Sequence, residues 1–197
     1  MLFSGMPRAK TLTTARLTLR PPRPGDEDDL FALHADPAVM RYFSEPPWTD
    51  RARAERKIED DAAAFERGEY FRFAMVLNET GRMIGNCTLF ALHTQNRRAE
   101  IGYALQSAHW GKGFMNEALA ALLSYAFNEL DLNRLEADID PRNAASANCL
   151  LRFGFIKEGF LRERWIVGGE VCDSELYGLL RRDWKPAVQT GTQRATG

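Results

Sequence analysis

One segment predicts most of this chain's architecture: Glu100-Ile-Gly-Tyr-Ala-Leu-Gln-Ser-Ala-His-Trp-Gly-Lys-Gly-Phe-Met-Asn-Glu-Ala-Leu119. Its first part alternates apolar side chains with small or polar ones, which is the period of a β-strand. The apolar set is Ala99, Ile101, Tyr103 and Leu105. From Met115 onward, apolar side chains recur at helical spacing instead: Leu119, Leu122, Leu123, Ala126, Phe127 and Leu130. The segment therefore predicts a strand, a short turn and a long amphipathic helix.

The turn between strand and helix carries two glycines, Gly111 and Gly113. Glycine permits backbone angles that a side chain forbids, and it lets a ligand approach the backbone closely. Backbone N–H groups and the positive end of a helix dipole meet at such a turn, which makes it a ready site for phosphate. The local pattern alone fits an ordinary tight turn equally well.

Two nucleotide-binding motifs do not fit this turn. A P-loop needs Ser or Thr after its Lys, and Lys112 is followed by Gly113. The dinucleotide fingerprint needs a third small residue, and Asn116 occupies that position.

The motif that fits is Trp110-Gly-Lys-Gly113 followed by Glu117-Ala118, which resembles the acetyl-CoA pyrophosphate loop of the GNAT N-acetyltransferase superfamily. A second motif, Asp140-Pro-Arg-Asn143 through Phe155, resembles the RimJ/RimL-like branch, the ribosomal-protein N-terminal acetyltransferases. The opening Thr14 to Arg20 and the closing Asp173 to Trp184 fit the same branch, so the resemblance covers residues 12–185. One departure is Ala108, where the superfamily usually has Gln or Arg. Because the loop binds through its backbone N–H groups, we expect the different side chain at position 108 to weaken cofactor binding little.

The order of predicted elements gives a mixed α/β (α+β) fold, with antiparallel strands followed by a βαβ unit and helices over the sheet. The resemblance implies a mostly antiparallel sheet that splays between its fourth and fifth strands, with the pantetheine arm in the gap. The predicted strands are 16–20, 71–77, 83–91, 99–105 and 134–139, plus two that end near Arg181. The predicted helices run to about His34, over 51–67, from Met115, and over 144–153.

Composition indicates a single globular domain, 12–185, between flexible tails at 1–11 and 186–197. A formal charge of −1 and a pI near 6.3 give no electrostatic case for nucleic acid or a membrane surface as partner. The longest apolar run is too short to span a bilayer, and the N-terminus does not fit a signal peptide. Three scattered cysteines favour a reducing compartment, hence the cytoplasm, and three scattered histidines argue against a metal site.

Acetyl transfer to an amine requires a neutral amine, donors for the oxygen of the tetrahedral intermediate, and a proton for the departing thiolate. Glu100 is the candidate general base, because it shares a strand face with Gly102 and Ala104, whose small side chains leave room for a substrate. The alternative is a surface glutamate paired with Arg97 or Arg98. The amine could also lose its proton through water.

Asn143 and Ser146 begin a helix, where both residue types are favoured as caps. The resemblance implies that Asn143 holds the pantetheine or substrate amide and that Ser146 is the proton donor to sulfur. Many relatives use Tyr instead, which leaves Tyr103 and Tyr177 as alternatives.

The remaining cofactor contacts are also implied by the resemblance. They are Tyr103, Ala104, Leu105, His109, Trp110, Gly111, Lys112, Gly113, Phe114, Met115, Asn116, Asn143, Ser146 and Phe153. His109 is equally well explained as a turn residue, and Phe153 as core. Lys112, Arg142 and Arg152 flank the phosphate path and are candidates for the charged end of the cofactor.

The acceptor pocket is expected beside the aromatic, proline-bearing segment Met40 to Trp48, with further walls on the hairpin strands. Its predicted walls are Tyr42, Phe43, Trp48, Phe73 and Asn86. We expect an acetyl-CoA-dependent N-acetyltransferase, possible as a homodimer, that acts on a protein N-terminal α-amine by direct attack in a ternary complex. A small amine, amino-acid-like metabolite or antibiotic is the alternative acceptor, and a non-catalytic acyl-CoA sensor is the alternative from another functional class.

Overall fold

The computed structural model describes residues 11–186, and the predicted tails at 1–11 and 186–197 lie almost wholly outside them. The strands are β1 Leu12–Thr13, β2 Leu17–Arg20, β3 Phe71–Leu77, β4 Met83–His93, β5 Arg98–Leu105, β6 Arg134–Ile139, β7 Ile156–Val167 and β8 Glu170–Leu180. The α-helices are α1 Glu27–Ala35, α2 Pro37–Met40, α3 Ala52–Arg67, α4 Phe114–Ser124 and α5 Ala144–Arg152. A 3-10 turn spans Ser107–His109, and a π-helical turn spans Tyr125–Glu129.

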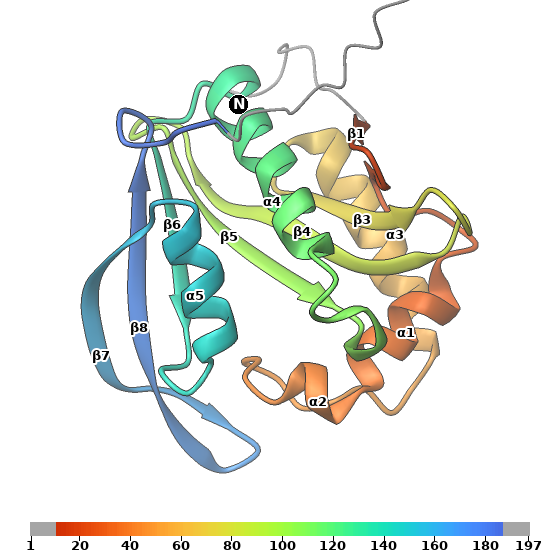
Figure 1. Ribbon diagram of the computed structural model, residues 1–197. Helices are drawn as coiled ribbons and strands as arrows, with labels where there is room; N and C mark the ends of the chain where they lie inside the picture. Colours follow the sequence, from red (N-terminus) through yellow and green to blue (C-terminus); the bar gives the residue numbers. More distant parts are fainter. Residues whose placement is uncertain (1–10, 187–197) are drawn as a thin grey trace, which may run out of the picture.

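Within residues 11–186, the strands form one sheet in the order β1-β2-β3-β4-β5-β6-β8-β7. Every neighbouring pair is antiparallel except β5 and β6, which run parallel and are joined through α4. Figure 1 shows α4 and α5 in front of the sheet and α3 behind it. The predicted mixed, mostly antiparallel sheet between helices is confirmed.

β5 and β6 pair over only three residues, from Arg98 opposite Arg134 to Glu100 opposite Glu136. Beyond Glu100 the two strands diverge, which is visible in Figure 1 as a widening wedge beside α5. The expected splay is therefore present. It lies between β5 and β6 because the two-residue strand β1 adds one to the strand count.

The strand alternation divides the apolar side chains between two clusters. Ile101 and Leu105 of β5 pack with α4 residues such as Leu122 in the larger cluster. Ala104 of the same strand packs with α1 and α3 in the smaller cluster, on the opposite face. Glu100 and Gly102 share the face of Ala104, so the candidate base lies on the side of α1 and α3.

Most predicted element bounds hold within one or two residues, and β3 and β6 match as predicted. The long helix differs, because its last part from Tyr125 winds as a π-helical turn in which the Leu130 N–H donates to the Tyr125 carbonyl. An apolar pattern cannot report this change, since α- and π-helical turns bury almost the same side chains. The short α2 was not predicted.

Candidate active site

The turn before α4 has the geometry that its glycines predicted. Gly111 has φ of 73° and Gly113 has φ of 80°, both in the left-handed region. Gly113 caps α4 without a side-chain hydrogen bond, so the first N–H groups of the helix have no partner within the helix. A Cβ added at Gly111 would meet nothing within 4 Å, so the space above the turn is open. This arrangement fits an anionic group held by backbone N–H donors.

Arg16, just before β2, ties this turn to the sheet. Its Nη1 donates to the Lys112 carbonyl at 2.9 Å, and its Nε pairs with Glu117 at 2.7 Å. Glu117 also accepts from the Thr14 hydroxyl at 2.6 Å. The sequence motif included Thr14 to Arg20 without assigning Arg16 a task, so this bracing is a feature that the sequence prediction missed.

Three predicted cofactor residues serve the shape of the turn itself. The Lys112 ammonium donates to the Ala108 carbonyl at 2.8 Å. The Trp110 indole donates to the Leu105 carbonyl at 2.7 Å, and the His109 ring meets Phe114 edge-on with centroids 5.9 Å apart. These contacts hold the backbone in place before any ligand arrives.

A cavity of about 680 Å³ occupies the splay and continues toward α1 and α3. Residues from both faces of β5 line it, with Glu100 and Gly102 on one face and Ile101 and Tyr103 on the other. A cavity with such a lining must pass through the gap between β5 and β6. Asn143 and Ser146 of α5 line the same cavity.

Glu100 contributes a carboxylate without a direct partner. Arg98 pairs with Glu136 at 2.6 Å and Arg97 with Asp131 at 2.9 Å, so the alternative ion pairs of Glu100 are not formed. Within residues 11–186 its carboxylate has neither an ion pair nor a hydrogen bond. Burial, and then the negative charges of Glu136 and Asp138, raise the pKa of Glu100 above its usual value. A carboxylate with a raised pKa is a stronger base.

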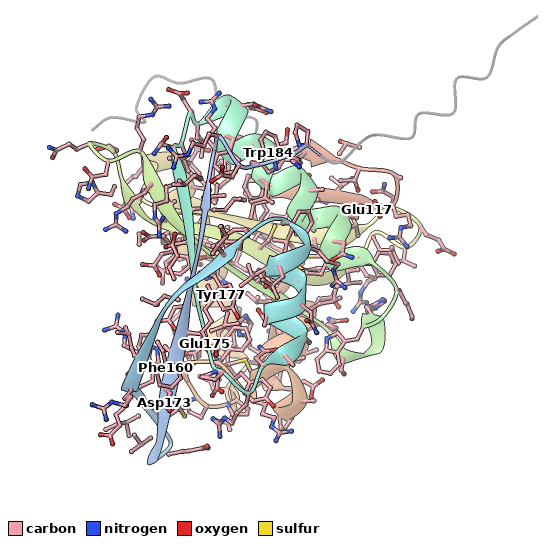
Figure 2. All side chains as sticks on the ribbon, turned by 60° about the vertical axis from the view of Figure 1, so that its left-hand side comes forward. Glu117, Phe160, Asp173, Glu175, Tyr177 and Trp184 are labelled. Atoms are coloured by element: carbon pink, nitrogen blue, oxygen red, sulfur yellow. The ribbon has the colours of Figure 1, made fainter. Side chains whose placement is uncertain are left out.

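The Tyr103 and Ser146 hydroxyl groups lie 2.7 Å apart, and either can donate to the other. The Asn143 side chain accepts from the Ser146 N–H at 3.1 Å, which confirms its predicted capping of α5. Burial raises the pKa of Tyr103, so its phenol stays protonated at neutral pH. Tyr177 does not join this pair, because its hydroxyl donates to Glu175 at 2.9 Å on β8 (Figure 2).

The acceptor side of the cavity includes three of the five predicted walls. Tyr42, Phe43 and Asn86 line it. The other two predicted walls, Phe73 and Trp48, are not among the residues that line this cavity. Phe73 is fully buried in the larger cluster, on the α4 side of the sheet, because its strand register turns it away from the cavity. Trp48 is buried, and its ring stacks on the His34 ring with the two centroids 4.3 Å apart. Trp48 therefore packs behind His34, which itself lines the cavity.

His34 was not predicted as a site residue, although it lines the cavity beside Asn86. Asn86 Nδ2 and His34 Nε2 are 3.5 Å apart. Burial, followed by the charge of Arg72, lowers the pKa of His34 to about 4, so the ring is neutral at pH 7. In the sequence, His34 is a single histidine near the end of a predicted helix, and nothing in that pattern indicates that it lines a cavity.

The other basic candidates divide between the two ends of the site. Arg142 pairs with Asp140 at 2.6 Å and with Glu170, which places it by the acceptor side rather than on the phosphate path. Arg152 lies 3.4 Å from Asn116 Oδ1, near the start of α4. Phe153 is partly buried against the larger cluster. In Figure 2, Glu117 in the first turn of α4 and the β7–β8 hairpin with Phe160 and Asp173 lie on opposite sides of the view.

Residues 11–186 lack the features of two other kinds of site. These residues contain no cluster of three or more His, Cys, Asp or Glu side chains that could hold a metal ion. They also contain no helix with the length and apolar character needed to cross a membrane.

Comparisons with known proteins agree with this geometry. The family described as "Acetyltransferase (GNAT) domain" matches residues 16–156. An uncharacterized N-acetyltransferase, p20 of Bacillus licheniformis, is 39% identical over 175 residues, which cover 89% of this chain and 98% of the relative. The [Ribosomal protein uS5]-alanine N-acetyltransferase of Escherichia coli is 27% identical and covers 93% of this chain and 96% of its own length.

Solved structures show the same fold. RimJ of Mycobacterium smegmatis, solved in complex with CoA-disulfide, superimposes with a TM-score of 0.77 at 25% identity. The match covers 86% of this chain and 87% of that one. This chain therefore belongs to the GNAT family and is an acetyl-CoA-dependent N-acetyltransferase.

Proposed function

We propose that the acceptor is the α-amine of a protein N-terminus, acetylated by direct attack in a ternary complex. The observation that carries the proposal is the unpaired Glu100 carboxylate in a cavity that runs through the β5–β6 gap to the Tyr103–Ser146 pair. A base and an acid thus line one passage. The similarity to a ribosomal-protein alanine N-acetyltransferase over 93% of the chain supports an N-terminal acceptor.

The order of proton movements follows from these positions. Glu100 takes a proton from the acceptor ammonium, directly or through water, and the neutral nitrogen then attacks the thioester carbonyl carbon. The C–N bond forms, the C–S bond breaks, and the thiolate takes a proton from the Tyr103–Ser146 hydroxyl pair. The nitrogen loses its second proton to solvent. Glu100 then releases its proton and the hydroxyl pair regains one, both by exchange with solvent, so one proton is released in each turnover and charges and atoms balance.

Acetyl-CoA fits the residues beside this passage. The open N–H groups at Gly111 and Gly113 suit its pyrophosphate. The edge of β5 from Ile101 to Leu105 has no strand partner on the β6 side within the described residues, so its backbone groups are available to the pantetheine amides. The candidate contacts on this strand and turn stay those predicted from the sequence.

A compact amine is the second candidate acceptor, because Tyr42 and Phe43 both line the cavity and could close over a small molecule. We also propose a reducing compartment, the cytoplasm, since Cys87, Cys149 and Cys172 are free thiols in the structure.

The deciding experiment offers acetyl-CoA with three kinds of acceptor: short peptides with a free α-amine and an internal lysine, small amines, and aminoglycosides. Mass spectrometry with fragmentation locates any added acetyl group. We expect acetylation at the α-amine alone. Acetylation of small amines with none on the peptides would replace the proposed acceptor with the second candidate.

A further inference from the structure

A charged cluster forms the far wall of the cavity, between α3 and β3. We call Lys57, Asp61, Tyr70 and Arg72 the Asp61 cluster. Asp61 is completely buried, with Lys57 Nζ 2.8 Å from its Oδ1. The Tyr70 hydroxyl donates to the same oxygen at 2.8 Å. Lys57, Tyr70 and Arg72 also line the cavity.

The charges of this cluster do not cancel. Lys57 and Arg72 supply two positive charges, whereas Asp61 supplies one negative charge. Burial raises the pKa of Tyr70, and His34 nearby is neutral because its pKa is lowered to about 4, so neither ring alters the sum at pH 7. Glu45, another carboxylate of the lining, is already paired with Arg53. Within the Asp61 cluster itself, one positive charge is therefore left over.

Arg72 is the residue that presents this charge to the cavity. Its Nε lies 3.1 Å from Asp61 Oδ2, with an angle too poor for a hydrogen bond. Within residues 11–186, neither of its terminal nitrogens donates a hydrogen bond, and its ion pair is with Asp61, although only 18% of the side chain is exposed. A guanidinium so deeply placed gains most from a ligand that accepts both N–H donors, and a carboxylate has that shape.

The strand register relates Arg72 to Glu100. Arg72 lies opposite Thr88 on β4, and Thr88 lies opposite Gly102 on β5. Glu100 is two residues along β5 on the same face. With strands about 4.8 Å apart, Arg72 and Glu100 are separated by roughly 12 Å between Cα atoms. Both side chains line the cavity, so a ligand that contacts both charged groups must span less than this Cα–Cα distance.

This span matches a peptide better than a free amino acid. An extended chain advances roughly 3.3 Å for each residue, so an α-amine at Glu100 brings the side chain of the second or third residue toward Arg72. We propose that Arg72 and Lys57 form an anion subsite that selects N-terminal acceptors with Asp or Glu at the second or third position. The proposal rests on the α-amine acceptor proposed above.

The test compares peptides that begin Ala-Glu or Ala-Ala-Glu with the same peptides carrying Gln. We expect wild-type protein to favour the Glu peptides by about tenfold or more in kcat/KM, the effect of a charge-assisted hydrogen bond. Arg72→Gln should abolish this preference. Lys57→Gln, which leaves the Arg72–Asp61 pair in place, should reduce it and serves if Arg72→Gln fails to fold.

The control is Arg67→Gln, on the same helix as Lys57. Arg67 pairs with Glu69 on the exposed surface and does not line the cavity, so the preference should stay. Equal rates for Glu and Gln peptides, or a preference that survives Arg72→Gln, would overturn the subsite and leave the α-amine acceptor intact.

A binding measurement separates the two proposals further. Calorimetry with the acetylated product peptides and CoA needs no turnover, and the Glu product should bind wild-type protein more tightly than the Gln product. Binding without this difference would refute the subsite. Failure of every peptide to bind or react would refute both proposals, whereas acetylated peptides without discrimination would refute only the subsite.

Discussion

The Tyr103 and Ser146 hydroxyl groups meet at 2.7 Å across the gap where β5 and β6 part. One comes from β5 and the other from the first turn of α5, so the contact exists only in the folded chain. Tyr103 also lies 3.4 Å from the Ser146 carbonyl oxygen. Because of this contact, Tyr103 and Ser146 form one hydrogen-bonded pair of candidate proton donors and are not alternatives to each other.

Removing either hydroxyl should slow acetyl transfer. Because general acid catalysis contributes about 10²–10⁴-fold, we expect Ser146→Ala and Tyr103→Phe each to lower kcat by at least tenfold with little change in acetyl-CoA affinity. The double variant should be hardly slower than the worse single variant, since the hydroxyls act together. Tyr177→Phe, whose hydroxyl donates to Glu175, is the control and should keep its rate. Fully additive losses would contradict the shared role.

Glu100→Gln should change the pH profile of kcat/KM. The raised pKa of Glu100 means that its carboxylate is protonated at a higher pH than that of an ordinary glutamate, so the wild-type rate should drop as the pH falls through this pKa. The variant should be slower by about 10²-fold at neutral pH and recover toward the pKa of the free amine, near 8. Steady-state rates between pH 5 and 9 test this.

Asp138→Asn provides the matched control for that experiment. The charge of Asp138 helps to raise the pKa of Glu100, so its removal should move the acidic limb of the wild-type profile to lower pH. A profile that is unchanged in both variants would mean that Glu100 is not the base.

The fold was predictable because its signals are local or periodic. The alternation from Ala99 to Leu105, the glycines at 111 and 113, and the helical spacing after Met115 each act through neighbouring residues. The register between β5 and β6 is not local. It follows from packing across the sheet, and only the family resemblance supplied the splay.

The site was predictable where a motif carried it and not where tertiary packing did. Glu100 and Ser146 stood out in sequence, and the structure places both on one cavity. Phe73 and Trp48 were misplaced, because aromatic side chains look alike in sequence whether they face a core or a pocket. Arg72 gave no signal, since its role depends on the buried Asp61 contributed by α3.

His34 should make the protein sensitive to mild acid. Its pKa is lowered from 6.5 to about 4 in the folded state, mainly by burial, so the unfolded chain binds more protons between these values. The free energy of unfolding therefore decreases as the pH falls through this window. His34→Gln cannot titrate, so its urea midpoint should fall less steeply between pH 7 and 4.5. Parallel slopes for the two proteins would show that His34 does not contribute.

The sharpest test of the turn before α4 uses two glycines with the same backbone angle. Gly111 has φ of 73° and Gly81, in the β3–β4 turn, has φ of 69°, and a Cβ at either would meet nothing within 4 Å. Valine at either position should cost a similar strain, about 1–2 kcal/mol. Only Gly111 belongs to the turn that leads into α4, where we expect a side chain to exclude the pyrophosphate. We therefore expect Gly111→Val to weaken CoA binding at least tenfold by calorimetry, whereas Gly81→Val should lower stability alike and bind CoA normally. Equal CoA affinity in the two folded variants would mean that the pyrophosphate lies elsewhere, because the strain is matched and only the position differs.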